Sequence, residues 1–260
     1  MTRGLWSRET VALMLLAALF PVGVIWLWTE GAEALSRLAL TALVVAAWHL
    51  IFMLTRAQPP SLSALVTALA IAMLVPEGLG VFKLALGISF GVAMGELVFG
   101  GWGRNVVNPA TVTLAFLGFG FPGFGWPVFD APVAWAAIPA GLIGVALGVM
   151  PAAVLVSSVL LGAVAVAAGA LPEPMMYAAG LVLVLLVADP VASAATSLGR
   201  WLQGGFYAAL VVLFSAGWSG AAPLQAAVAA ALLASLAAPL FDEAALSLWV
   251  YRRRRRHGRT

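Results

Sequence analysis

The sequence predicts an all-α integral membrane protein. Hydrophobic residues make up 63% of its 260 residues, charged residues make up only 9%, and the mean hydropathy is +1.08. A soluble domain carries about 25% charged residues. Apolar runs of about 15 to 21 residues follow one another, separated by Gly, Pro or single charges. These runs predict about ten membrane spans, near residues 10–28, 34–54, 62–76, 80–100, 107–122, 133–149, 151–170, 175–189, 201–217 and 223–241.

Several of the predicted spans are too short for a straight crossing, which needs roughly 20 residues. The spans 62–76, 107–122 and 175–189 are examples, and each contains or adjoins a proline. Short spans indicate half-helices, or helices that meet a break inside the membrane. Non-helical backbone survives at that depth only where protein or a water-filled cavity satisfies its polar groups. The breaks are therefore the places to look for a site.

The first span begins like a signal peptide, because Arg3 and Arg8 precede its apolar run. That run is long and contains Trp26 and Trp28, and no small-x-small cleavage site stands before Glu30. We therefore expect an uncleaved first helix.

The second span contains His49, which has no second histidine or carboxylate three or four residues further on. This is a weak metal signal, so we expect His49 to form a hydrogen-bonded contact between helices. The chain has no cysteine. It therefore offers no disulfide, no thiolate metal site, no iron–sulfur ligation and no cysteine nucleophile, and no metal site is predicted.

The fourth span ends in an unusual carboxylate, Glu96, which stands beside small residues that let backbone or a ligand approach: Gly91, Gly100 and Gly101. Two interpretations remain open. Glu96 reaches the interface and pairs with Arg104, or it belongs to an ion pathway through the membrane.

The fifth span begins with Asn108-Pro109-Ala110, where the asparagine is predicted to cap the helix. A helix N-terminus that points into the protein also attracts anionic or electron-rich ligand atoms. Asp189-Pro190 is the counterpart late in the chain, and further polar residues follow it: Ser193, Thr196 and Arg200. Asp189 either caps or pairs with Arg200, or it serves a function as an intramembrane carboxylate.

The proline positions reveal an internal repeat. Pro76 and Pro109 are 33 residues apart, as are Pro190 and Pro223, and the offset between the two pairs is 114. This offset places spans one to five over spans six to ten, so we expect two halves, 1–122 and 123–246. Because five is odd, the halves face opposite ways, and sites of such folds lie between the halves near the bilayer midplane. We therefore expect one cavity lined by Asn108, Asp189, Thr196, Arg200 and Glu96.

Charges predict the orientation. Most basic residues fall on one side, which is cytoplasmic under the positive-inside rule: Arg3, Arg8, Arg56, Arg104, Arg200 and Arg252 to Arg256. Most acidic loop residues fall on the other: Glu30, Glu33, Glu77, Asp130 and Glu173. Arg37 and Lys83 are exceptions. We expect both termini in the cytoplasm, and a basic tail, 247–260, that contacts anionic lipid and not nucleic acid.

Two long blocks carry a family resemblance: SALVTALAIAMLVPEGLGVFKLALGISFGVAMGELVFGGWGRNVVNPATVTLAFLGFGFP (63–122) and ADPVASAATSLGRWLQGGFYAALVVLF (188–214), followed by APLFDEA. They resemble the RnfD/NqrB family, which comprises RnfD, a membrane component of Rnf electron-transport complexes, and NqrB, its homologue in the sodium-pumping NADH:quinone oxidoreductase. The resemblance covers about half of the chain. It implies ten helices in two inverted halves, a urea-transporter-like scaffold, and flavins within a redox-driven sodium or proton pump in the bacterial inner membrane.

The chain also departs from that family. The D-G-x-S-G-A-T segment, whose threonine is esterified to FMN in the family, is absent after the fifth span, as is the later G-x-I-G-E-T-S segment. Where the family reads G-K-E or G-K-Q, this chain has Gly95-Glu96-Leu97. We therefore expect a short variant without covalent FMN.

These observations predict a membrane subunit of a flavin-dependent, redox-driven, ion-translocating complex, active only together with other membrane, flavoprotein or iron–sulfur subunits. The resemblance leaves room for a non-covalent riboflavin or FMN between the halves, with Asn108, Asp189, Thr196, Arg200 and Arg104 as contacts. Glu96 and Asp189 are the expected ion pathway. The alternative is a urea-transporter-like transporter or channel for a small solute or ion, without redox chemistry. An aquaporin-like pore is excluded because Asn-Pro-Ala occurs once and no arginine follows it.

Overall fold

The computed structural model describes residues 7–59 and 61–257, and within these residues the chain forms helices and no β-strand. The all-α prediction is therefore confirmed. Arg3, which the orientation argument used, lies outside the described residues. The α-helices are α1 (Arg8–Glu30), α2 (Ala32–Arg56), α3 (Ser63–Leu74), α4 (Val81–Gly95), α5 (Pro109–Gly120), α6 (Ala131–Trp135), α7 (Ala137–Ala146), α8 (Ala152–Ala167), α9 (Glu173–Val182), α10 (Ser197–Gly217) and α11 (Pro223–His257). A 3₁₀-helix, η1 (Leu97–Phe99), continues α4, and a π-helix, η2 (Leu183–Val187), continues α9.

Each predicted span coincides with one helix or with two consecutive ones. Four helical segments are long and apolar enough to cross a membrane: α1, α2, α4 with η1, and α11. Shorter apolar helices account for five other spans: Ser63–Leu74, Pro109–Gly120, Ala131–Ala146, Ala152–Ala167 and Glu173–Val187. The chain is a multi-pass membrane protein, and its short helices correspond to the spans that the sequence marked as interrupted.

Prolines and glycines set the helix boundaries. Helix α3 ends at Leu74, because Val75 precedes Pro76 and is extended. Pro109 and Pro223 each begin a helix, the position where a missing N–H does no harm. Between α1 and α2, Gly31 has a φ of 62° and so reverses the chain within one residue.

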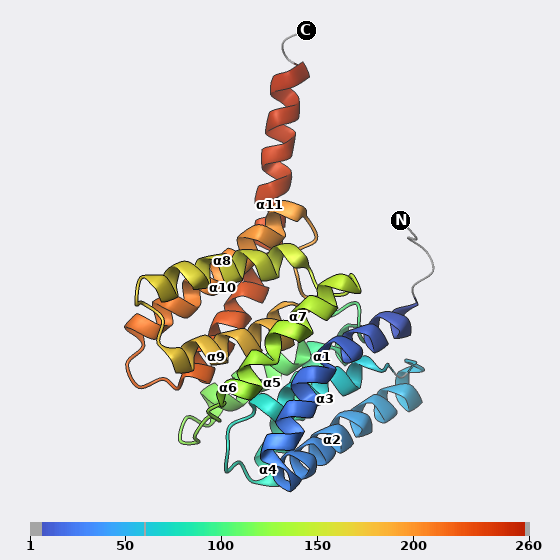
Figure 1. Ribbon diagram of the computed structural model, residues 1–260. Coiled ribbons are helices and arrows are strands. Elements are labelled where there is room, and N and C mark those ends of the chain that lie inside the picture. Colours follow the sequence, from blue (N-terminus) through green and yellow to red (C-terminus); the bar gives the residue numbers. More distant parts are fainter. Residues whose placement is uncertain (1–6, 60, 258–260) are drawn as a thin grey trace.

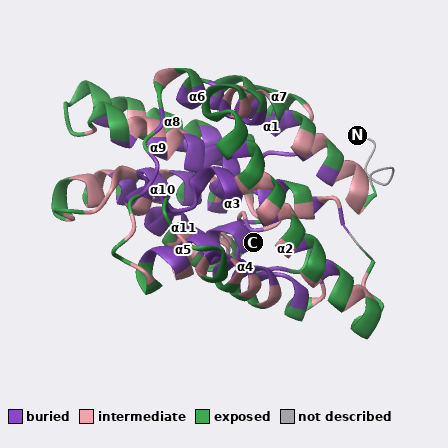
Figure 2. Cartoon of the chain, turned by 90° about the horizontal axis from the view of Figure 1, so that it is seen from below, coloured by how far each residue is buried: buried purple, intermediate pink, exposed green. Residues whose placement is uncertain are grey.

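The short helices form the centre of the molecule. Ten of the 12 residues of α3 are buried, and so are all five residues of η2. Figure 2 shows these buried residues gathered in the middle, with exposed residues on the surrounding helices. Many of the exposed residues are large and apolar, such as Leu43, Leu142 and Leu160. In a bilayer such side chains face lipid, so the outer surface needs no polar cover.

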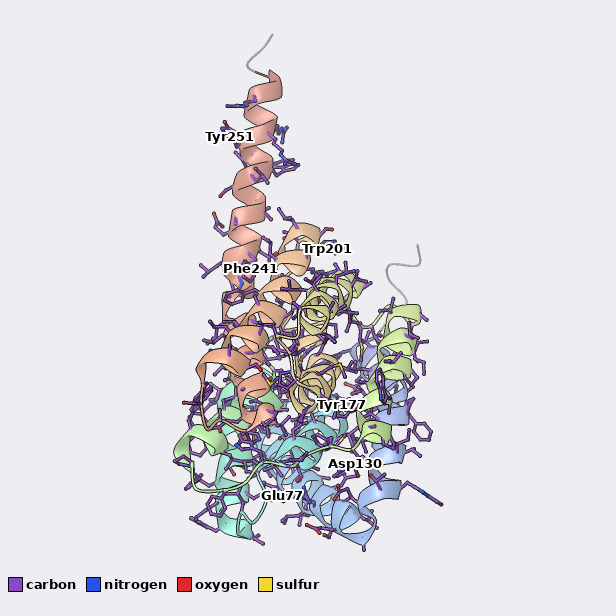
Figure 3. All side chains as sticks on the ribbon, turned by 60° about the vertical axis from the view of Figure 1, so that its left-hand side comes forward. Glu77, Asp130, Tyr177, Trp201, Phe241 and Tyr251 are labelled. Atoms are coloured by element: carbon purple, nitrogen blue, oxygen red, sulfur yellow. The ribbon has the colours of Figure 1, made fainter. Side chains whose placement is uncertain are left out.

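Helix α11 extends well beyond the helix bundle (Figure 1). Its projecting end carries Tyr251, whereas Glu77, Asp130 and Tyr177 lie toward the opposite end of the molecule (Figure 3). Residues 247–257 of the predicted basic tail are thus a continuation of the last helix. Arg253 lies over the Trp249 ring at 5.2 Å, and Arg255 over the Tyr251 ring at 4.7 Å.

Candidate functional site

The connection between α4 and α5 carries an aromatic side chain into the interior. Gly100, Gly101 and Gly103 have φ values of 107°, 87° and 96°, a region that L side chains rarely adopt. These glycines let the backbone turn sharply on both sides of Trp102, which is only 7% exposed. The Asn105 side chain accepts a hydrogen bond from the Gly103 N–H at 3.2 Å and so holds the turn. The loop thereby leads directly into the cap of α5.

Asn108 makes two kinds of contact at the start of α5. Its Oδ1 accepts hydrogen bonds from the N–H groups of Ala110 and Thr111, at 2.8 and 3.4 Å, which is the predicted cap. Its Nδ2 donates to Asp189 Oδ2 at 2.8 Å, across 81 residues of sequence. The cap therefore also joins the two helix breaks that the sequence singled out.

Asp189 follows η2, at the break before α10. Its Oδ1 accepts a hydrogen bond from the Val191 N–H at 2.8 Å, so each carboxylate oxygen has a donor. The Ser193 hydroxyl donates to the Asp189 carbonyl oxygen at 2.6 Å and fixes the turn. Asp189 is 5% exposed. Its partner is Asn108 and not Arg200, the cation that the sequence offered as an alternative.

A small cavity lies beside this pair. Its volume is about 10 Å³, which is room for one water molecule. Its polar wall consists of Asn108, Asp189, Ser63 and Thr67, and Trp102 lies on one side. The expected meeting of Asn108 and Asp189 at one cavity is present in the structure.

Thr196 and Arg200 do not line that cavity, so the expectation of a single site with all five residues is wrong. Thr196 caps α10 by accepting from the Gly199 N–H at 3.0 Å, and its own N–H and hydroxyl donate to Asp242 at 2.8 and 2.6 Å. Arg200 Nε donates to the Ala194 carbonyl oxygen at 2.8 Å. Both residues thus belong to a separate cluster at the start of α10, completed by Asp242 of α11. The sequence reasoning missed Asp242, although its motif, APLFDEA, was part of the family resemblance.

Glu96 is fully buried at the end of α4, and Arg104 is exposed, so the proposed pairing of these two residues is not formed. Instead, Glu96 Oε1 lies 3.9 Å from His49 Nε2 of α2. This distance is longer than a hydrogen bond. His49 does contact another helix, as expected, but its Nε2 has no hydrogen-bond partner among the described residues.

A second cavity of about 10 Å³ surrounds this pair. Its polar wall contains Arg8, His49, Gln58, Ser61 and Glu96, and Trp102 lines it as well. Trp102 therefore forms a wall that the two cavities share. Within the described part of the chain, no three His, Cys, Asp or Glu side chains are grouped so that they could hold a metal ion.

The residues predicted to hold a non-covalent flavin do not fit one. The cavity at Asn108 and Asp189 has room for a single water, and Arg104 is exposed. A much larger groove of about 850 Å³ runs between α6 and α10, with an almost entirely apolar wall. The hydroxyls of Ser158 and Tyr207 in that wall already donate to the carbonyl oxygens of Gly204 and Ala179. An isoalloxazine ring or a phosphate would find too little room in the cavity and too few free donors in the groove.

Comparison with known proteins supports the resemblance seen in the sequence. The model of the NQR2, RnfD, RnfE family matches residues 3–184, more than half of the chain. Three relatives are named as one and the same subunit of the Na(+)-translocating NADH-quinone reductase. The protein of Yersinia pestis is 41% identical over 81 residues, which are 31% of this chain and 20% of the relative. That of Pseudomonas aeruginosa is 38% identical over 91 residues, 35% of this chain and 23% of the relative, and that of Klebsiella pneumoniae 37% over 98 residues, 37% and 24%.

The match is therefore to a minor part of these relatives, since it spans about a quarter of their length or less. It is nevertheless consistent with the helical architecture described above. The chain belongs to the NQR2, RnfD, RnfE family.

Proposed function

We propose that this chain is a membrane subunit of a redox-driven, ion-translocating electron-transport complex in the bacterial inner membrane. In this proposal it acts as a scaffold and ion path, and it works only together with partner subunits that carry the electrons. The relatives are named as subunits of an Na(+)-translocating NADH-quinone reductase, which supports this class of function.

The observation that carries the proposal is the hydrogen bond between Asn108 and Asp189. It links the break before α5 to the break before α10, and both residues are buried. A carboxylate at such a position is expensive in a membrane, and it is retained in pumps and transporters where it serves an ion pathway. Asp189 is held in place and borders a cavity that admits one water, as an ion-binding carboxylate requires.

We further propose that residues 1–122 and 123–246 are inverted repeats. Helix pairs that pack in the first half have packing counterparts in the second: α2 with α4 corresponds to α8 with α10, and α4 with α5 to α10 with α11. Likewise α3 packs on α5, and α9 packs on α11. Contacts of α1 with α7 and of α5 with α11 join the proposed halves. With an odd number of spans in each half, the start of α1 and the tail of α11 would share the cytoplasmic side.

We propose that the chain carries no covalent FMN, because the acceptor motifs of the family are absent from its sequence. The poor fit of a non-covalent flavin to the predicted residues supports the assignment of the electron carriers to partner subunits. Flavoprotein and iron–sulfur subunits are the partners that this arrangement requires.

The rival function, passage of a small solute such as urea, has less support. Each polar cavity described above holds about one water, and Trp102 separates them. A solute path would need a wider polar channel, whereas single ions or protons can use sites of this size.

The proposal is tested in the native bacterium with a chromosomally tagged chain. The chain should purify together with redox subunits, and inverted membrane vesicles should show ion uptake driven by NADH. We expect Asp189→Asn to lower this uptake at least about tenfold, whereas Glu77→Gln, at an exposed carboxylate beyond α3, should leave it unchanged.

Two results would contradict the proposal. One is a chain that purifies without any redox partner. The other is flux of urea in proteoliposomes of the purified chain that depends on Glu96, which would establish the transporter instead.

A further inference from the structure

Unsatisfied polar atoms gather in one place in this protein. Six buried side-chain nitrogen or oxygen atoms lack a hydrogen-bond partner among the described residues. Four of them line the second cavity: His49 Nε2, Gln58 Oε1, and both carboxylate oxygens of Glu96. Buried polar groups in proteins are nearly always paired, so this concentration calls for an occupant. His49 and Glu96 are only 9% and 0% exposed, so bulk water does not satisfy them.

The chemistry of the four atoms defines the occupant. Gln58 Oε1 and the two Glu96 oxygens are acceptors, while the imidazole nitrogen donates when it carries a proton and accepts when it does not. The cavity therefore lacks donors, and a proton and one water molecule supply them. A cavity of about 10 Å³ has room for that single water.

The charged groups around the pair do not neutralise Glu96. Arg8 of α1 lines the cavity, but its guanidinium contacts the carbonyl oxygens of Trp102 and Pro59 at 3.4 and 3.3 Å and Glu9 Oε1 at 3.4 Å. The other charged group that acts on Glu96 is Asp189, which has the same sign as Glu96 and lies beyond Trp102. Helix α3 and the residue before it contribute only the hydroxyls of Ser63 and Ser61 to the two cavities.

A metal cation fits this cavity poorly. Hard cations are bound by sets of about six oxygen ligands, and imidazole suits softer transition metals. The cavity offers three unpaired side-chain oxygens beside an imidazole. No larger group of metal-ligating side chains occurs in the part of the chain that the structure describes.

We propose that His49 and Glu96 form a proton-binding site in which one proton is shared between Nε2 and Oε1 with the help of one water. This inference rests on the proposed function for its role, since it identifies the ion handled at Glu96 as a proton. The proton enters from the side of Arg8 and Gln58. It is released toward Asp189 only when Trp102 moves, because that side chain separates the two cavities.

The chain offers a direct measurement, since His49 and His257 are its only histidines. In a His257→Gln background, ¹⁵N-histidine labelling leaves one imidazole signal, and His49→Gln assigns it by removing it. The labelled protein is purified without redox partners in lipid nanodiscs, and the signal is followed from about pH 4 to pH 10.

Three variants and one ion give the readout. We expect Glu96→Gln to change the proton affinity of His49 by about tenfold or more, because a carboxylate 3.9 Å away interacts strongly with an imidazole. The control Glu77→Gln should leave the titration unchanged. Replacing choline chloride by sodium chloride up to about 300 mM should also leave it unchanged. Should Glu96→Gln fail to yield folded protein, Glu96→Asp, which moves the carboxylate away from His49, is compared in the same way.

Two outcomes would overturn the proposal. A titration that ignores both substitutions of Glu96 would show that the pair shares no proton. A titration midpoint that moves with sodium concentration would show that a metal cation competes for the site. Because the measurement needs no redox partner, its failure is distinct from a failure of the proposed function, which the vesicle experiment on Asp189 tests separately.

Discussion

The two buried carboxylates, Asp189 and Glu96, occupy similar positions but are treated differently by the fold. Each follows the end of a helix, each borders a cavity of about 10 Å³, and Trp102 lines both cavities. Asp189 accepts hydrogen bonds on both oxygens, whereas Glu96 accepts none from the described residues. The difference teaches that burial alone does not define a role: Asp189 is fixed as part of the structure, and Glu96 is left open to exchange a ligand.

The largest effect is expected at Asp189. Asp189→Ala leaves the Asn108 amide and the Val191 N–H without acceptors, and should lower the free energy of unfolding by about 2 to 4 kcal/mol. Thermal unfolding in detergent measures the change, with Asp189→Asn as the comparison that keeps an acceptor. Equal stability of Asp189→Ala and the wild type would show that the bonded pair does not hold the two breaks together.

The next largest effect is expected where α4 and α5 touch. A Cβ on Gly91 would lie 2.6 Å from the Thr113 nitrogen and 2.8 Å from the Pro109 carbonyl oxygen, so Gly91→Ala must displace α5. We expect a loss of about 1 to 3 kcal/mol, because backbone cannot yield as a side chain can. Gly180→Ala, which meets nothing within 4 Å, is the control. If both variants unfold at the same temperature, the close contact of α4 with α5 does not position Asn108.

A smaller effect on stability is expected at Glu96. Glu96→Gln removes a charge and breaks no hydrogen bond among the described residues, so the free energy of unfolding should change by less than about 1 kcal/mol. The same substitution should nevertheless impair ion uptake in vesicles. A stability loss as large as that of Asp189→Ala would remove the contrast between the two carboxylates.

The smallest effect is expected at Arg104, the exposed residue that the sequence linked to Glu96 and to cofactor binding. Arg104→Ala should change the free energy of unfolding by less than about 0.5 kcal/mol, since no ion pair of this side chain is formed within the described residues. Ion uptake should be unaffected. A clear loss of uptake in Arg104→Ala would return this residue to the site.

Local rules in the sequence were sufficient for the elements. Apolar runs determined the spans, Pro76, Pro109 and Pro190 marked the breaks, and Asn108 was recognised as a cap because a cap acts within three residues. The meeting of Asn108 with Asp189 was also foreseen, but through the proline repeat and not through local chemistry.

Tertiary structure alone decided the partners of the remaining polar groups. Glu96 meets His49 and Thr196 meets Asp242, each across more than 40 residues, and no local pattern favours these pairs over Glu96 with Arg104 or Asp189 with Arg200. Hydrophobicity gives little help here, because in a membrane the lipid-facing and core-facing sides of a helix are both apolar. The sequence of this protein thus determines where its helices begin and end, while helix packing determines which buried charges face one another.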